Sequence, residues 1–331
     1  MTKLVTIGIP IYKRLTTLPQ ALQSVASQNY PHIELIVSDN GQNGNKVKEI
    51  VEQWYPRPFR FRQNPSTVPI APHYNQLIEA ATGEFCVILD DDDTLSPNFV
   101  SELVGLFDRY PQIAVAMAGQ EVVDVSGNVL RRSSDQLPEL LTGEEFVRTW
   151  NAYGFECYTA MMGRTGEMKR CGGYEDFPRG THSDDALLIK LCLTGSVAFS
   201  KHCTFRWRLA ETSFGWSMIC EELAEDTRQF MNFLDSDPTV LAYASRKPES
   251  WAELKPGLMK MGWHTYYERW AGLYRDRMPF AQWIRAGFAM PFILEYYRAV
   301  RSTLWCESKA KVLDGVKRRW PWTQRVWQSW R

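Results

Sequence analysis

A short apolar segment that runs into four consecutive aspartates constrains the fold of this chain more than any other stretch. Residues 85–89 (FCVIL) indicate a strand buried on both faces, the kind found inside a parallel sheet. The aspartates would then lie at the carboxyl edge of that sheet, where open α/β sheets bind ligands: they are Asp90, Asp91, Asp92 and Asp93. Four such carboxylates repel each other unless a cation or raised pKa values relieve the repulsion, and oxygen ligands suit Mg2+ or Mn2+. The alternative is a solvated acidic loop.

Strands and helices alternate through the first part of the chain. Apolar patterns predict strands at residues 4–11, 33–37, 59–62, 85–89 and 113–118, and helices at about 15–25, 46–54, 72–81 and 97–110. A hairpin is expected at residues 122–130, around a turn at 126–128. Alternation with short links predicts an α/β fold with a mostly parallel sheet and helices on both faces.

Polar residues at two further positions have both a structural and a functional interpretation. Asp39 follows the second strand, where it could meet a ligand or make an Asx-turn. Asp184 and Asp185 precede an apolar helix at residues 186–193. Ser183 or Asp184 would be a good N-cap, and acids in a first turn are favoured by the helix dipole whatever the function. Capping and catalysis are compatible here, because a cap residue fixes the position of its neighbour.

The pattern changes after residue 215 to long helices, predicted at residues 218–234, 251–275 and 280–305. The chain has 38 residues of each charge sign, and residues 281–331 hold ten Lys and Arg against three acids, so the first 280 hold 28 against 35. Residues 309–331 combine seven basic residues with four tryptophans, which fits a helix lying in an anionic membrane interface. Packing of the C-terminal helices in a homodimer would use the same residue types, whereas no recognition fold supports nucleic acid binding.

The cysteines and the hydropathy pattern bound the cellular location. Seven cysteines are scattered without a CxxC pair, which argues for a reducing compartment and against disulfides or a zinc site. We see no leader pattern and no apolar run of the roughly 18 to 20 residues that cross a bilayer. We expect a cytoplasmic protein, with a peripheral position on the inner face of the plasma membrane as the further expectation.

Four segments in this order and spacing resemble one known family. Residues 5–14 (VTIGIPIYKR), 33–41 (IELIVSDNG), 83–93 (GEFCVILDDDD) and 182–188 (HSDDALL) are similar to the family 2 type of nucleotide-sugar glycosyltransferases with a GT-A fold, of the bacterial polysaccharide-assembly kind. The resemblance covers about residues 4–210, so residues 1–215 would form the catalytic domain and 216–331 a helical region. It implies transfer of a sugar from a nucleoside diphosphate, usually with inversion, to the hydroxyl of a lipid-linked or oligosaccharide acceptor in the assembly of O-antigen, capsule or exopolysaccharide.

The resemblance also implies roles for individual residues. Asp90 and Asp92 match the outer carboxylates of the DxD motif, and Asp92 is the expected direct ligand of Mn2+ or Mg2+. Asp185 matches the general base, with Asp184 beside it as the residue that would exchange roles with it. The residues expected to contact the nucleotide sugar are Pro10, Tyr12, Arg14, Asp39, Asn40, Arg62, Asn64, Asn75, Asp90, Asp91 and Arg208.

Three departures from the family pattern affect these roles. Lys13 stands where Asn is usual, and Asn40 replaces a second Asp. Arg208 occupies the place where many members have a histidine near the metal, which leaves a cation for direct contact with diphosphate. Two alternatives stay open: a sugar-nucleotide pyrophosphorylase, although residues 41–46 lack phosphate-loop spacing, and a non-catalytic, membrane-associated nucleotide-sugar binding protein.

Overall fold

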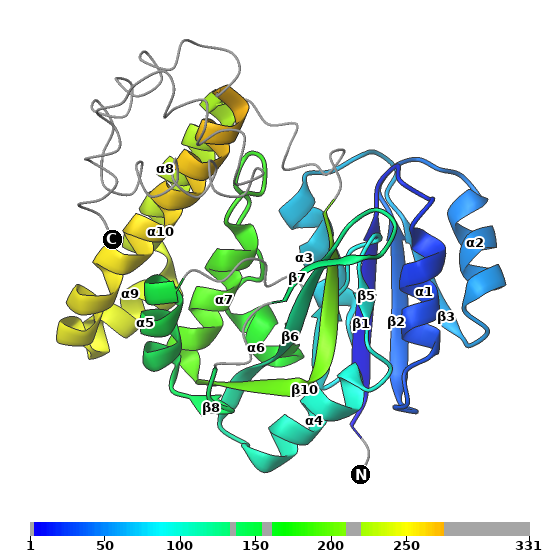
Figure 1. The fold of residues 1–331 in the computed structure, drawn as a ribbon, viewed down its shortest axis with the longest axis horizontal. Coiled ribbons are helices and arrows are strands. Elements are labelled where there is room, and N and C mark those ends of the chain that lie inside the picture. Colours follow the sequence, from blue (N-terminus) through cyan, green and yellow to red (C-terminus); the bar gives the residue numbers. More distant parts are fainter. Residues whose placement is uncertain (1–2, 133–136, 154–160, 210–219, 275–331) are drawn as a thin grey trace, which may run out of the picture. The chain divides into compact units, whose positions relative to one another are not determined.

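The computed structural model describes residues 3–132, 137–153, 161–209 and 220–274 (Figure 1). The chain divides into two compact units, Met1–Gly257 and Leu258–Arg331. The first unit therefore continues past residue 215, where the sequence predicts a boundary. The predicted helix at 280–305, the basic tail at 309–331 and any dimer packing through that tail lie outside the described residues.

The amino-terminal part follows the predicted alternation of strands and helices. Four strands and three helices form it: β1 (Val5–Ile11), α1 (Leu18–Ala26), β2 (Ile33–Asp39), α2 (Lys46–Trp54), β3 (Phe59–Gln63), α3 (Ile70–Ala80) and β4 (Phe85–Ile88). The strands pair in parallel in the order β3-β2-β1-β4. Their carboxyl ends therefore meet at one edge of the sheet, which we call the carboxyl edge.

Alternation along β1 explains why helices cover both faces of this sheet. Val5, Ile7 and Ile9 are fully buried in one apolar cluster with the inward residues of α1, α2 and α4 (Phe99–Arg109). On the opposite face Leu77 of α3 lies against Gly8, where an added Cβ would come within 3.1 Å of it. Each fully buried aliphatic side chain of such a core contributes about 1.5–3 kcal/mol. The predicted α/β architecture is confirmed.

Beyond β4 the sheet is mixed, which differs from the mostly parallel sheet that the sequence predicts: among the described strands, four pairings are parallel and five are antiparallel. The remaining strands are β5 (Thr94–Leu95), β6 (Ile113–Val123), β7 (Val129–Arg132), β8 (Leu140–Leu141), β9 (Met162–Arg164) and β10 (Ser196–Arg208). The described sheet runs β3-β2-β1-β4-β9-β6-β10-β5, with β7 paired to β6 and β8 to β10. β10 is parallel to β6, whereas β9 lies antiparallel between β4 and β6. The predicted hairpin is present as β6 and β7, closed by the hydrogen bond from the Gly127 N–H to the Asp124 carbonyl (3.0 Å).

Helices connect and follow these strands. They are α5 (Gly143–Tyr153), α6 (Thr165–Arg170), α7 (Ser183–Thr194), α8 (Cys220–Ser236), α9 (Pro238–Arg246) and α10 (Pro248–Tyr274). α7 is buried along most of its length and packs against α5, α6 and α9 (Figure 1). Its burial fixes the helix that carries Asp184 and Asp185 relative to the sheet. Among the described residues, no helix combines the length and the apolar character that a membrane span needs.

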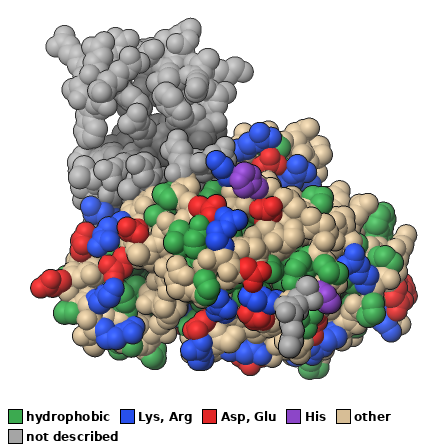
Figure 2. Space-filling model, turned by 90° about the horizontal axis from the view of Figure 1, so that it is seen from below, with side chains coloured by type: hydrophobic (Ala, Val, Ile, Leu, Met, Phe, Trp, Pro, Cys, Tyr) green, Lys and Arg blue, Asp and Glu red, His purple; other side chains and the backbone are tan. Residues whose placement is uncertain are grey.

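The surface on the side where β1 begins carries charges of both signs. Figure 2 shows this side from below, with Lys and Arg side chains interspersed among Asp and Glu and with hydrophobic side chains in small groups. Ion pairs here include Lys3 with Asp108 (2.9 Å) and Arg109 with Glu139 (2.5 Å). Exposed pairs of this kind contribute at most about 1 kcal/mol each. Negatively charged side chains are concentrated instead at the carboxyl edge, in the aspartate run that follows β4.

Candidate functional site

The aspartate run lies directly after β4, at the carboxyl edge, as the sequence predicts. Asp91 and Asp92 are 7% and 8% exposed, and Asp93 is fully buried. Arg14, from the loop after β1, donates to Asp91 Oδ1 (3.1 Å) and pairs with Asp92 Oδ2 (2.7 Å). Burial raises the pKa of Asp91 to about 6 and also raises the pKa of Asp92, while the Arg14 charge lowers both. One guanidinium thus offsets part of a concentrated negative charge.

Asp90 is held from the other side by a tyrosine. The Tyr74 hydroxyl of α3 donates to Asp90 Oδ1 at 2.5 Å. Burial, followed by the charge of Asp92, raises the pKa of Asp90 to about 7. The charge of Asp184 also raises it, so the amino end of α7 lies within electrostatic range of the aspartate run. Tyr74 is a site residue that sequence reasoning missed, because only the tertiary packing of α3 brings it to β4.

Arg208 lies at the end of β10 and anchors the aspartate run. Its backbone N–H donates to Asp93 Oδ1 (2.9 Å), and its Nε donates to the Asp92 carbonyl (3.0 Å). Its Nη1 donates to the carbonyls of Asp124 (3.3 Å) and Val125 (2.9 Å) in the β6–β7 turn. Arg208 is 6% exposed. The structure thus gives its guanidinium a supporting role, and the predicted contact with diphosphate stays a prediction.

Asp39 organises the loop that follows β2. Its two carboxylate oxygens accept four hydrogen bonds: from the Gly41 N–H (2.8 Å), from the Asn43 N–H and side-chain amide (3.0 and 2.8 Å), and from Gln63 Nε2 (3.1 Å). The residue is fully buried. The bonds from Gly41 and Asn43 are those of an Asx-turn, which is the structural interpretation of Asp39, and Gln63 of β3 adds a further hydrogen bond.

Asn40 and Asn64 form a second buried network beside Asp39. Asn64 Nδ2 donates to Asn40 Oδ1 (2.9 Å), which also accepts from the Val68 N–H (3.0 Å). Asn40 Nδ2 donates to the Val68 carbonyl (2.9 Å). The two asparagines therefore shape the wall of the carboxyl edge between β2 and β3. Their predicted contact with the nucleotide stays a prediction.

The other predicted nucleotide-binding residues lie at different depths. Pro10 is buried within β1, in register with Ser38 of β2. Tyr12 follows β1 and is 48% exposed, with Lys13 Nζ 5.1 Å from the centroid of its ring. Arg62 of β3 donates from Nη1 to the Gln76 carbonyl (3.1 Å). Of these residues, Tyr12 is the one that the fold leaves most accessible.

Asn75 holds a loop rather than facing open space. Its Nδ2 donates to the Tyr174 carbonyl and its Oδ1 accepts from the Tyr174 N–H, both at 2.8 Å. The preceding Gly173 has φ +67°, and a Cβ on it would lie 2.2 Å from Asn75 Oδ1. The Asn75 amide therefore clamps the loop between α6 and α7, which leads to the predicted catalytic aspartates.

The two candidate bases at the start of α7 differ in their surroundings. Asp185 Oδ2 lies 2.7 Å from His182 Nδ1. Asp184 Oδ1 accepts from the Asp185 N–H (3.0 Å), and burial raises the pKa of Asp184 to about 6, with the Asp185 charge adding to it. The capping prediction for Ser183 or Asp184 is wrong. The N-cap is His182 in a left-handed conformation (φ 69°), and the Ser183 hydroxyl donates to the Glu175 carbonyl (2.7 Å) instead.

The carboxylates at this edge suit a divalent cation. No group of three His, Cys, Asp or Glu side chains in the described part of the chain is arranged to hold a metal by itself. Mg2+ is commonly bound by only one or two carboxylates together with substrate phosphates and water, and Asp90 and Asp92 provide that set. In addition, Asp93 Oδ2 is buried and has no hydrogen-bond partner among the described residues, and burial raises the pKa of Asp93 well above its usual value. Mn2+ or Mg2+ therefore fits the donor set.

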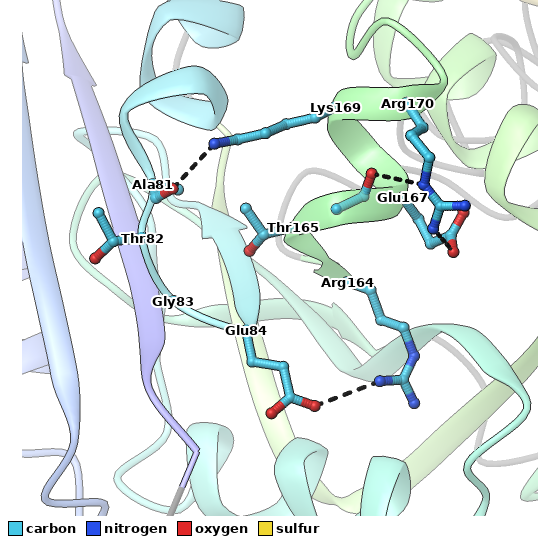
Figure 3. A pocket seen from close by; sticks show the side chains of 10 residues that line it. Ala81, Thr82, Gly83, Glu84, Arg164, Thr165, Glu167, Lys169 and Arg170 are labelled. Atoms are coloured by element: carbon cyan, nitrogen blue, oxygen red, sulfur yellow. Dashed lines mark hydrogen bonds and ion pairs between the residues drawn. The ribbon is translucent and has the colours of Figure 1, made fainter.

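A separate hollow lies at the opposite edge of the sheet. It is lined where β4 begins and where β9 leads into α6 (Figure 3). Its cations are engaged: Lys169 donates to the Ala81 carbonyl (3.1 Å), Arg164 pairs with Glu84 (3.5 Å), and Arg170 contacts Glu167. This hollow therefore offers no unpaired cation to an anionic ligand, and the site chemistry remains at the carboxyl edge.

Comparison with known proteins finds a matching family model and several glycosyltransferase relatives. The sequence model described as "Glycosyl transferase family 2" matches residues 6–169. "Putative glycosyltransferase EpsE" of Bacillus subtilis is 24% identical over 187 residues, which are 55% of this chain and 63% of that protein. A "GalNAc(5)-diNAcBac-PP-undecaprenol beta-1,3-glucosyltransferase" of Campylobacter jejuni is 28% identical over 136 residues, 38% of this chain and 43% of that protein. The chain thus spans less than two thirds of the length of these relatives.

Solved structures share the fold at lower identity. S. aureus TarS 1-349 has a TM-score of 0.58 and 15% identity, covering 90% of this chain and 81% of that one. The mannosyltransferase PcManGT from Pyrobaculum calidifontis, in complex with GDP-Man and Mn2+, has a TM-score of 0.52 and 15% identity, covering 93% and 89%. Residues 6–169 thus form a domain of glycosyl transferase family 2, and the glycosyltransferase relatives and the shared GT-A fold support this assignment.

Proposed function

We propose that this chain transfers a sugar from a nucleoside diphosphate to an acceptor hydroxyl with inversion at the anomeric carbon. The observation that carries the proposal is that the chain holds two separate sets of carboxylates, one at the carboxyl edge and one in the first turn of α7. The aspartate run after β4 is buried and clamped by Arg14, and Asp184 of α7 interacts electrostatically with Asp90. Two sets of carboxylates in different environments suit two roles: one set helps to stabilise the leaving diphosphate, and the other accepts the proton of the acceptor hydroxyl.

The diphosphate role belongs to Asp90, Asp92 and Arg14. Asp92 and Asp90 would hold Mn2+ or Mg2+, which when bound supplies positive charge to stabilise the leaving diphosphate. Arg14 already lies 2.7 Å from Asp92 Oδ2 and can turn its guanidinium toward phosphate oxygens when the donor enters. The Tyr74 hydroxyl holds Asp90 at 2.5 Å and keeps that carboxylate oriented.

The proton role belongs to Asp184. The acceptor hydroxyl loses its proton as it attacks the anomeric carbon from the face opposite the diphosphate, and general base assistance is worth ~10²- to 10⁴-fold in rate. The Asp185 carboxylate lies beside the His182 ring. The charge of Asp184, in contrast, raises the pKa of Asp90. The charge interaction between Asp184 and Asp90 is the basis on which Asp184, in place of Asp185, is proposed as the general base.

The donor and acceptor are proposed from chemistry and from the relatives. TarS is known in complexes with UDP and UDP-GlcNAc, and PcManGT with GDP-Man, so a nucleoside-diphosphate hexose is the proposed donor. The Campylobacter relative is named for an undecaprenol-linked substrate, and a lipid-linked or oligosaccharide acceptor in polysaccharide assembly is the corresponding proposal here. The catalytic domain, predicted at residues 1–215, would lie within the compact unit Met1–Gly257. The basic, Trp-rich residues 309–331 would hold the enzyme peripherally on an anionic inner membrane face.

A donor panel tests the proposal. Purified protein with Mn2+ or Mg2+ is offered UDP-, GDP- and dTDP-sugars and a lipid-linked acceptor, and release of the nucleoside diphosphate is measured. We expect release with one donor class, a loss of roughly two to four powers of ten in kcat for Asp184→Asn with donor affinity retained, and a smaller loss for the matched variant Asp185→Asn. Donor binding without any release would favour the non-catalytic binding protein. A full loss in Asp185→Asn alone would return the base role to Asp185.

A further inference from the structure

A fully buried carboxylate on α8 binds the backbone of the segment that leads into α7. Asp226 Oδ1 accepts from the Arg179 N–H (3.0 Å), and Asp226 Oδ2 accepts from the Thr181 N–H (2.8 Å). Asp226 is 0% exposed. Its contacts therefore fix the peptide N–H groups of Arg179 and Thr181, which lie three residues and one residue before His182, the N-cap of the helix that carries Asp184.

Aromatic side chains of α8 hold the same segment from its apolar side. Phe230 stacks on the His182 ring with 4.7 Å between centroids and 27° between planes. Phe177, at the beginning of the segment, lies edge-on to Phe230 and Phe233, at 6.4 Å from each. Phe230 is fully buried. The helix thus contacts residues 177–182 through both backbone and side chains.

The conformation of His182 shows why such support is needed. His182 has φ 69°, a left-handed conformation that costs a non-glycine residue roughly 1–2 kcal/mol. A strained residue of this kind persists only when its surroundings hold it there. The Phe230 stack and the Asp226 hydrogen bonds provide this restraint, and His182 in turn lies 2.7 Å from Asp185.

Burial of the carboxylate itself points to a specific role. An ionised carboxylate is costly to bury unless hydrogen bonds compensate it, and an apolar side chain would fill the same volume at lower cost. Here the compensation comes from the peptide N–H groups of Arg179 and Thr181, whose orientation the carboxylate thereby fixes. Asp226 therefore constrains the segment in a way that packing alone would not.

We propose that Asp226 is a positioning residue for catalysis: from α8 it sets the backbone before α7 and so the place of Asp184 at the sugar. This inference rests on the proposed role of Asp184 as general base. Its consequence is that α8, which lies beyond the last strand of the sheet and outside the residues matched to the family, belongs to the catalytic machinery.

Asp226→Asn tests the proposal, because it keeps the side-chain shape but replaces one acceptor oxygen with a donor that opposes a peptide N–H. We expect kcat to fall at least about tenfold with the KM for the donor changed less than about twofold, since the donor site is elsewhere. Hydrogen exchange should become faster in residues 177–183. Asp235→Asn is the matched control on the same helix, where Asp235 is exposed and pairs with Lys255; it should change neither measurement.

Two results would overturn the proposal. Unchanged exchange in residues 177–183 of Asp226→Asn would show that the carboxylate does not hold this segment. Faster exchange with kcat per folded molecule unchanged would show that the segment does not position the base. If Asp226→Asn fails to fold, Phe230→Leu serves instead, because it removes the stack on His182 while keeping the carboxylate. The same result is then expected: kcat falls while the KM for the donor changes little. Hydrogen exchange can be measured in protein that is not turning over. It therefore tests the restraint of residues 177–183 even if the proposed glycosyltransferase activity is absent.

Discussion

Gly173→Ala provides a quantitative test of the clamp between Asn75 and the loop before α7. A Cβ at Gly173 would lie 2.2 Å from Asn75 Oδ1 and 2.9 Å from Asn75 Cγ. Neither distance is tolerable, so the Asn75 amide must move. Moving it breaks both hydrogen bonds to Tyr174, each now 2.8 Å long.

The neighbouring glycine supplies the reference for the magnitude. Gly172 also has a positive φ, +80°, but a Cβ on it meets nothing within 4 Å. Alanine at either position pays roughly 1–2 kcal/mol for the left-handed backbone. Gly173→Ala additionally loses two hydrogen bonds worth about 1 kcal/mol each. The free energy of unfolding should therefore fall by about 2 kcal/mol more in Gly173→Ala than in Gly172→Ala.

Thermal unfolding of the two variants under matched conditions measures this difference. An extra loss of about 2 kcal/mol corresponds to roughly 4–8 °C in Tm for a domain of 150–250 residues. The double variant Asn75→Ala/Gly173→Ala should be little less stable than Gly173→Ala, because both changes remove the same two hydrogen bonds. Equal Tm values for Gly172→Ala and Gly173→Ala would refute the clamp.

Three further predictions concern the chemistry and the membrane. EDTA should abolish turnover and Mn2+ or Mg2+ should restore it, while Asp92→Asn should lose both nucleotide affinity and rate; full activity in chelator would contradict the metal site. Burial raises the pKa of Asp184 to about 6, and a base must be ionised, so kcat should fall tenfold per pH unit below about pH 6 and level off above it. Asp184→Asn should remove this limb of the pH profile. Deletion from Lys309 onward should abolish flotation with anionic vesicles, and salt should weaken the intact protein's binding; equal binding to neutral vesicles would argue against an electrostatic anchor.

Local patterns in the sequence predicted most of the framework. In β1 the β-branched run that begins at Val5 ends at Ile11, as expected, and α2 spans the predicted residues 46–54. These elements could be predicted because the alternation of buried and exposed positions produces a hydrophobic pattern within a short stretch of sequence. The aspartate run was predictable for the same reason: a buried strand and its polar terminus are adjacent in the sequence.

The supports of the site could not be predicted in this way. Asn75 and Tyr174 are 99 residues apart, and no local pattern relates them. His182 is a poor residue for φ 69° on propensity alone, and its conformation depends on contacts from α8. Arg208 has the charge expected of a phosphate ligand. Its guanidinium instead donates to the carbonyls of Asp92 and Val125, which only the folded chain brings close to it.

The anchoring by Arg208 also sets the order in which the site can be completed during synthesis. The Asp92 carbonyl and its donor on Arg208 are 116 residues apart. At about 5–20 residues per second, the ribosome needs roughly 6–23 seconds to bridge that interval. During this time the first four strands can pair, but Asp93 lacks the backbone N–H that it accepts from. In a nascent chain the aspartate run therefore lacks this anchor until β10, the last strand in the described part of the chain, joins the sheet.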